Sequence, residues 1–276
     1  MEPPPIARQI ADIAASQWGM VTTAQARIHG IARANLAHRV RTGELERTEH
    51  YGVYRLAAAP SSPLDDLRAA WLSTNPEMLA PERTAALHPD AVIASAAAAM
   101  VHGIGDVYPA PYRMIVPGRR QNATGSIAYS WRALDCRDVE VVDGLPVTTR
   151  ERTVVDLLID EGDVSLAADA LRDAYRDQYD LDETRLADLL APHAGRLGKS
   201  PGDDPGALGY LSVAAGVDAV SEAERALDRV LRSKIPLPGI EAFLEKVAYQ
   251  WPDLTVGPPA TASSLPGVKP SHIPRT

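Results

Sequence analysis

The chain has 276 residues, 45% of them hydrophobic, and a formal net charge of −8. This length and composition suffice for two modest domains with buried cores and exclude a chain that is disordered throughout. The negative charge argues against a protein that binds nucleic acid or anionic membrane over its whole surface, yet residues 1–59 hold seven Arg against five Asp and Glu. A mildly basic head therefore precedes an acidic body.

Cys136 is the only cysteine, so the chain can form neither an internal disulfide nor a thiolate metal cluster. The first residues, MEPPPIAR, lack the pattern of a secretory signal. The longest apolar run, residues 91–101, is far shorter than the roughly 20 residues of a membrane helix. We expect a soluble, cytoplasmic protein that does not bind membranes, in which Cys136 is half-buried.

The first 59 residues predict a winged helix-turn-helix. Thr22 and Gln25 form a capping-box pattern that starts the second helix, and Gly30 makes the turn to the third helix, which ends at Gly43. The wing is the segment that joins two short strands. The expected helices are residues 6–19, 22–29 and 32–42, the expected strands are 45–48 and 53–56, and the wing is 49–52.

A proline-bounded linker at residues 60–63 precedes a mixed α/β body at 63–217, which makes the chain an α+β protein. Thr148 and Glu151 form a second capping-box pattern. The body is expected to contain helices at 64–72, 94–102, 148–159, 164–179 and 182–191, strands at 112–116, 127–131 and 139–142, a hairpin turn at 143–144, and irregular connections at 76–89 and 195–209. A helical segment at 218–250, with helices at 221–234 and 240–249, and a Pro-rich disordered tail at 251–276 complete the chain.

In a winged helix the third helix lies in the major groove of DNA. If Leu36 and Val40 face inward, the Arg and Asn side chains of this helix face outward or flank the groove, where Arg forks onto guanine and Asn onto adenine. Two threonines at the start of the second helix offer hydroxyl and backbone N–H groups to a phosphate. The candidate DNA-binding residues are Thr22, Thr23, Arg33, Asn35, His38, Arg39, Arg41, Arg47 and His50.

For each of these basic residues taken alone, a solvated helix face is the alternative. Negative charge in and beside the wing also opposes DNA contact there, because a wing that enters a groove favours Arg or Lys. We therefore expect the wing to contribute little affinity and the third helix to do most of the reading. The residues concerned are Glu44, Glu46 and Glu49, opposed by Arg47, His50 and Arg55.

The sequence lacks the common enzyme signatures. No acidic residue lies two positions before any of the four lysines, so the carboxylate-x-lysine core of restriction-type nucleases is absent. Asp180 and Asp182 follow Gly125 by more than 50 residues, the wrong spacing for a nucleotidyltransferase metal pair. His88 and His102 are expected in structural roles at helix ends. We expect no catalytic residue, no metal site and no cofactor.

Four blocks of the sequence occur together in a known order. They are QWGMVTTAQARIHGIARANLAHRVRTGELERTEHYGVYRLAAAP at 17–60, ASAAAAMVHGIGD at 94–106, IVPGRR at 115–120 and DGLPVTTRERTVVDLL at 143–158. With them the chain resembles, over residues 6–217, the AbiEi-type antitoxins of type IV toxin-antitoxin systems. The resemblance places Thr22, Thr23, Arg33, Arg39 and Arg41 on the family's DNA-binding segment.

The resemblance implies a sequence-specific DNA-binding antitoxin and autorepressor of an abortive-infection system that gives phage resistance. Its partners would be double-stranded DNA, at inverted repeats in its own promoter, and a nucleotidyltransferase-like toxin that the C-terminal domain counteracts. Inverted repeats admit a dimer or two copies side by side. The alternative is a protein-interaction module, in which the winged helix and the acidic body bind a protein.

After about Val220 the chain departs from the family's usual pattern. The run SEAERALDRVLRSKIPLP at 221–238 is similar to the start of a nuclease-like domain found on some relatives, but the catalytic carboxylates of that domain are missing. We expect a degenerate remnant that does not cut DNA.

Overall fold

The computed structural model describes residues 5–86, 89–120, 125–176 and 181–218, which belong to one compact unit, Met1–Ala223. The expected helices at 221–234 and 240–249 and the tail at 251–276 lie outside the described residues. Within the described residues, no helix is long and apolar enough to span a membrane.

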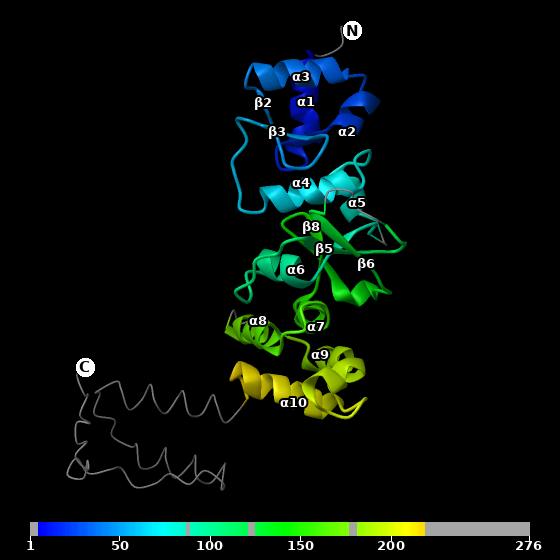
Figure 1. Ribbon diagram of the computed structural model, residues 1–276. Coiled ribbons are helices and arrows are strands. Elements are labelled where there is room, and N and C mark those ends of the chain that lie inside the picture. Colours follow the sequence, from blue (N-terminus) through cyan, green and yellow to red (C-terminus); the bar gives the residue numbers. More distant parts are fainter. Residues whose placement is uncertain (1–4, 87–88, 121–124, 177–180, 219–276) are drawn as a thin grey trace, which may run out of the picture. The chain divides into compact units, whose positions relative to one another are not determined.

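The N-terminal region folds as a winged helix-turn-helix, as the sequence predicts (Figure 1). Ile10, Leu36 and Leu45 are buried in one cluster that joins the helices to the small sheet. Strand β3 pairs antiparallel with β1 on one side and with β2 on the other. The elements in chain order are α1 (Ile6–Ala15), β1 (Met20–Thr22), α2 (Thr23–Ile28), α3 (Arg33–Arg41), β2 (Leu45–Arg47) and β3 (Val53–Leu56).

The start of α2 is set by a capping box, which confirms the prediction. Thr22 Oγ1 accepts a hydrogen bond from Gln25 N at 3.0 Å, and Gln25 Oε1 accepts one from Thr22 N at 3.0 Å. Strand β1 is not predicted, because three residues are too few to show an alternating pattern. The first helix accordingly ends at Ala15, before Gly19.

A five-stranded mixed sheet lies in the body, in the order β6-β5-β4-β8-β7. The central strand β4 pairs antiparallel with β5 and parallel with β8. The sequence predicts β5, β6 and β7, and the predicted hairpin turn at 143–144 is confirmed, because it joins the antiparallel strands β7 and β8. The sequence analysis gives no strand bounds for β4, which has two residues and leads into an alanine-rich helix, or for β8, where Pro146 argues against a strand. The strands are β4 (Val92–Ile93), β5 (Tyr112–Val116), β6 (Ile127–Trp131), β7 (Val139–Val142) and β8 (Leu145–Thr148).

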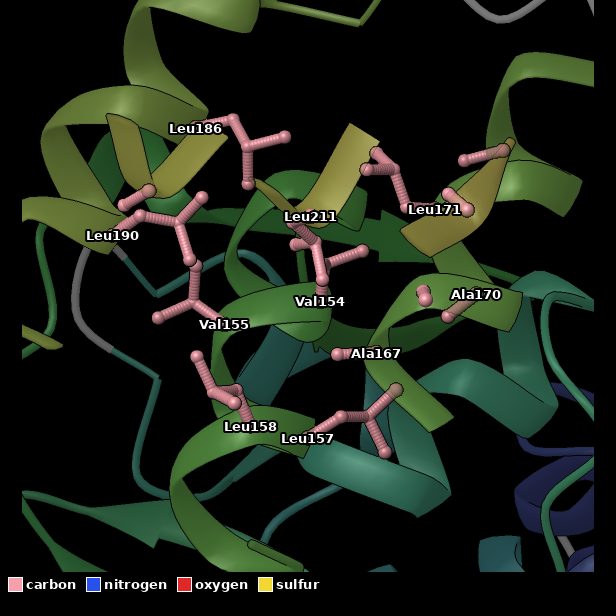
Figure 2. Packing of buried hydrophobic residues seen from close by; sticks show 14 of the residues in the cluster. Val154, Val155, Leu157, Leu158, Ala167, Ala170, Leu171, Leu186, Leu190 and Leu211 are labelled. Carbon is pink, nitrogen blue, oxygen red and sulfur yellow. The ribbon is translucent and has the colours of Figure 1, made fainter. Parts of the chain in front are cut away.

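The helices at the C-terminal side of the described residues pack around α7. Figure 2 shows Val154 and Leu158 of α7 in one buried cluster with Leu171 of α8, Leu190 of α9 and Leu211 of α10. Burial of these side chains from four helices supplies the hydrophobic stabilisation of this part of the body. The remaining elements are α4 (Asp65–Thr74), α5 (Ala80–Thr84), α6 (Ser95–His102), η1 (Cys136–Asp138), α7 (Arg150–Asp160), α8 (Val164–Arg176), α9 (Glu183–Leu190), η2 (Ala191–Leu197) and α10 (Asp204–Ala215).

Two segments that the sequence predicts as irregular connections contain helices. Helix α5 lies within 76–89, and α10 begins within 195–209, where Asp203 caps it by accepting a hydrogen bond from Gly206 N at 3.0 Å. In both helices a proline, Pro81 or Pro205, lies in the first turn, where its missing N–H costs no intrahelical hydrogen bond.

The second predicted capping box is wrong by one residue. Thr148 ends β8, and its hydroxyl lies 2.8 Å from that of Thr153. Thr149 caps α7 instead, by accepting the backbone N–H three residues later at 3.4 Å. Glu151 accepts a hydrogen bond from Asp182 N at 3.0 Å, so this glutamate joins α7 to the start of α9 rather than closing a box.

The winged helix packs directly against α4 and against the turn between β7 and β8. The Trp18 indole N–H donates to Asp143 O at 3.0 Å, and its ring meets the Trp71 ring edge to face, with centroids 6.1 Å apart. Met20 and Val53 belong to the same buried cluster as Trp71. Residues 60–63 therefore connect two parts of the chain that share a hydrophobic core.

Candidate nucleic-acid interface

Helix α3 presents a polar face because its apolar side chains point inward. Leu36 is fully buried and Val40 is half-buried, whereas Arg33, His38 and Arg41 are exposed. The sequence predicts this orientation from the helical period.

Three arginines of the candidate set are exposed and open to a ligand: Arg33 and Arg41 on α3, and Arg47 at the end of β2. Among the described residues, none of the three forms an ion pair with a carboxylate, and Arg41 Nη2 lies 3.3 Å from His38 Nδ1. Guanidinium groups in this state keep donors for phosphate oxygens or for guanine. Asn35 is half-buried at the edge of the same face.

Pairing within the head compensates two of the three wing glutamates. Arg39 pairs with Glu44, and only 18% of the Arg39 side chain is exposed. Arg55 pairs with Glu46 at 3.0 Å. Of the three glutamates, it is therefore mainly Glu49 whose negative charge would oppose DNA contact by the wing. The same pairing leaves Arg39 less available to DNA than the three exposed arginines, because its charge is already partly satisfied.

Two candidate residues, Thr22 and His50, are buried and cannot contact DNA. Thr22 is fully buried, and its hydroxyl donates to Pro76 O while it caps α2. His50 is 5% exposed, with Nε2 3.4 Å from Asp66 Oδ1 of α4. Both predictions are corrected for the same reason: segments that follow the winged helix in sequence cover these side chains.

The expected phosphate site at the start of α2 is closed as well. Thr23 is half-buried, its backbone N–H donates to Gly52 O at 2.8 Å, and its hydroxyl donates to the same oxygen at 3.2 Å. Both donors of Thr23 are therefore used inside the protein, where they hold the wing to α2.

Tyr51, at the wing turn, is not among the residues predicted from the sequence. Its side chain is 82% exposed, and its hydroxyl accepts a hydrogen bond from Arg33 Nη2 at 3.3 Å. An aromatic residue before Gly52 in the wing is the signal that could have identified it, since exposed tyrosine offers both a ring and a hydroxyl to a partner.

A buried ionic network ties the residues after β6 to α7. Arg132 Nη1 and Arg152 Nε donate to Asp156 Oδ1 at 3.0 and 2.9 Å. Asp156 is fully buried, and its Oδ2 has no hydrogen-bond partner among the described residues. Burial raises the pKa of Asp156 to about 6, against the lowering effect of the two arginines.

His102 has the structural role that the sequence predicts. It ends α6, lies buried, and donates from Nε2 to Thr148 O at 2.7 Å. Burial lowers its pKa, so the neutral ring is favoured. His88 lies outside the described residues.

An apolar hollow on the body is lined by Ile115, Trp131 and Val141. Trp131 is 72% exposed and Val141 is 55% exposed. Cys136 also lines it and is exposed rather than half-buried, which corrects the prediction. Exposed large apolar side chains around one hollow are typical of a surface that binds another molecule.

The third helix with its exposed arginines, a preceding helix joined to it by a tight turn, and a three-stranded sheet that carries the wing define the class of protein: a winged helix-turn-helix protein. A family model described as "Transcriptional regulator, AbiEi antitoxin" matches residues 8–57, and one described as "AbiEi antitoxin C-terminal domain" matches residues 90–201. The two matches together cover more than half of the chain. The chain belongs to the AbiEi antitoxin family, and its domains are those of an antitoxin with a regulatory role. Neither matching family is described as an enzyme.

Among solved structures, the chain is similar to the RV2827C protein from Mycobacterium tuberculosis, with 19% sequence identity and a TM-score of 0.47. The similarity covers 80% of this chain and 81% of that chain. No curated protein matches the chain.

Proposed function

We propose that this chain is the DNA-binding antitoxin and autorepressor of a type IV toxin-antitoxin system that gives phage resistance by abortive infection. Its winged helix binds inverted repeats in the system's own promoter, and its body counteracts a nucleotidyltransferase-like toxin encoded beside it. The match of a transcriptional-regulator model to the head and of an antitoxin model to the body supports this division of roles.

The observation that supports DNA binding is a set of exposed arginines on α3 and on the nearby strand β2. Arg33, Arg41 and Arg47 are exposed and lack carboxylate partners in the described part of the chain, although the chain as a whole has a net charge of −8. Because these arginines lack carboxylate partners among the described residues of an acidic protein, the surface formed by α3 and β2 is suited to an anionic ligand. Helix α3 fits the major groove, and two copies on inverted repeats would read successive half-sites.

The test is a gel-shift series with duplex DNA from upstream of the operon. Arg33→Ala and Arg41→Ala are each expected to weaken binding by about 1 to 3 kcal/mol if the arginine forks onto a base. If it holds a phosphate, the slope of log K against log salt should flatten by about one unit instead. The matched control is Arg176→Ala in α8, which removes the same charge from a 68% exposed side chain of the body. Equal binding by the α3 variants and the control would overturn the assignment.

A second arm of the same series separates repression from antagonism of the toxin. Cells that express the neighbouring toxin gene together with either α3 variant should recover growth, because the body at 63–217 is unchanged in both variants. Loss of rescue in step with loss of DNA binding would contradict the proposed division of roles.

A second candidate function is a protein-interaction module, which the apolar hollow with its exposed Trp131 favours. In that case the wild-type chain would fail to bind promoter DNA at every salt concentration and would form a stable complex with a co-expressed protein partner. Trp131→Ala should then weaken the complex and leave the fold intact, because that side chain is 72% exposed.

A further inference from the structure

The wing turn is held in place on both sides of Tyr51. On one side, His50 is buried against α4, with Nε2 3.4 Å from Asp66 Oδ1. On the other, Gly52 O accepts hydrogen bonds from Thr23 N and Thr23 Oγ1 at 2.8 and 3.2 Å. Gly52 adopts a φ of +78°, a left-handed conformation that glycine permits at little cost. The residues on both sides of Tyr51 therefore contact other elements, His50 contacting α4 and Gly52 contacting α2.

Within the described part of the chain, the Tyr51 side chain makes a polar contact with α3. Tyr51 is 82% exposed, and its hydroxyl accepts from Nη2 of Arg33, the first residue of α3, at 3.3 Å. Arg33 is itself exposed and forms no ion pair with a carboxylate among the described residues. The tyrosine hydroxyl is thus the group in the described structure that limits where the Arg33 guanidinium points.

We propose that Tyr51 is a positioning residue for Arg33 and so determines part of the sequence specificity of the winged helix. This inference rests on the proposed DNA-binding function and deepens it. A guanidinium group carries five N–H donors in a planar fork. The tyrosine oxygen takes one of them, and the donors that remain can form the bidentate contact with O6 and N7 of guanine.

The physical gain is preorganisation. A free arginine side chain loses rotamer entropy when it docks on a base, and an anchor that already restricts it reduces that loss on binding. The reduced entropy loss strengthens binding when the Arg33 guanidinium contacts its base in the promoter. It does not strengthen binding when the same guanidinium contacts only phosphates of unrelated DNA. Tyr51 should therefore affect the ratio of specific to non-specific affinity more than it affects affinity in general.

The experiment compares Tyr51→Phe with wild type, using the full chain, promoter duplex and an unrelated duplex of the same length. Tyr51→Phe removes one oxygen from an exposed ring, so the fold should be unaffected. We expect promoter affinity to fall about three- to tenfold, the effect typical of losing one hydrogen bond, and affinity for the unrelated duplex to stay unchanged. The matched control is Tyr108→Phe, the same change at a 92% exposed tyrosine of the body, which should alter neither affinity.

A double-mutant cycle with Arg33→Ala tests whether Tyr51 acts through Arg33. In the Arg33→Ala background, Tyr51→Phe should cause no further loss of promoter affinity. Additive losses, or a Tyr51→Phe variant indistinguishable from Tyr108→Phe, would overturn the positioning role. If wild type does not prefer promoter over unrelated DNA, the proposed function fails. If it does prefer the promoter and Tyr51→Phe changes nothing, only the role of Tyr51 fails.

Discussion

At the scale of single residues, the carboxylate of Asp156 makes stability depend on pH. Its pKa is about 6 in the folded protein, and about 3.9 is usual in an unfolded chain, so the folded state holds a proton that the unfolded state releases between about pH 4 and pH 6. The free energy of unfolding therefore falls as pH rises through this window, by up to about 3 kcal/mol. Above about pH 6, Asp156 is ionised in both the folded and the unfolded state, and its titration no longer affects stability.

Asp156→Asn should remove this dependence. We expect the free energy of unfolding of wild type minus that of Asp156→Asn to decrease between about pH 4 and pH 6, as measured by urea unfolding at each pH. Because the difference is taken at each pH, the titration of His102 cancels. Asp12→Asn, the same change at an exposed position of α1, serves as control. A difference that stays constant across the window would argue against a raised pKa.

The face of α3 could be predicted from the sequence, whereas several of its side-chain partners could not. Helical periodicity alone places Leu36 inside and Arg33 and Arg41 outside. The pairing of Arg39 with Glu44 and the burial of His50 depend on where β2 and α4 lie in space, and no local pattern specifies that. The contact between Tyr51 and Arg33 was missed for the same reason.

At the scale of elements, Thr22 acts on α2 and not on DNA. Thr22→Val keeps the branched shape but removes the oxygen that accepts from Gln25 N and donates to Pro76 O. We expect the free energy of unfolding to fall by about 1 to 3 kcal/mol in thermal or urea unfolding. Thr22→Ser, which retains the hydroxyl, should be close to wild type. A weaker salt dependence of DNA binding in Thr22→Val, without loss of stability, would restore Thr22 as a phosphate contact.

The elements that the sequence predicts share strong local signals, and those it misses lack them. The winged-helix helices, β5 to β7 and α7 to α9 carry periodic apolar residues or cap residues. Strand β4 is too short to show a period, and it exists because β5 and β8 supply its hydrogen bonds. In α5 and α10, a proline that usually marks a loop occupies the first helical turn. Tertiary pairing and the exact position of a proline decide these cases.

At the scale of the described unit, Trp18 joins the winged helix to the body. Its ring contacts Trp71, lies 5.1 Å from the Arg68 guanidinium, and donates to Asp143 O. Trp18→Ala should lower the free energy of unfolding by about 3 kcal/mol and make the chain susceptible to protease near residues 57–63. Thermal unfolding and limited proteolysis measure both effects.

The control for that prediction is Trp131→Ala, the same substitution at a 72% exposed side chain. It should change stability by about 0.5 kcal/mol or less. If both variants behaved alike, the contacts of Trp18 would contribute nothing to holding the parts together. Composition suggests the linker at 60–63, but the sequence carries no sign of these contacts, because they join Trp18 to residues that are distant in the sequence, such as Trp71 and Asp143.

The close fit of Trp18 at the β7–β8 turn restricts which heads and bodies can be combined. Gly144 in that turn has a φ of +79°, and a Cβ added there would lie 3.0 Å from the Trp18 ring. An exchange of residues 1–59 between related proteins, whether by engineering or by recombination, should therefore give an unstable product. The exchangeable module would have to carry α4, α5 and a compatible turn with it. Under the proposed DNA-binding function, new sequence specificities should therefore arise more readily by substitutions on α3 and the wing than by exchange of residues 1–59.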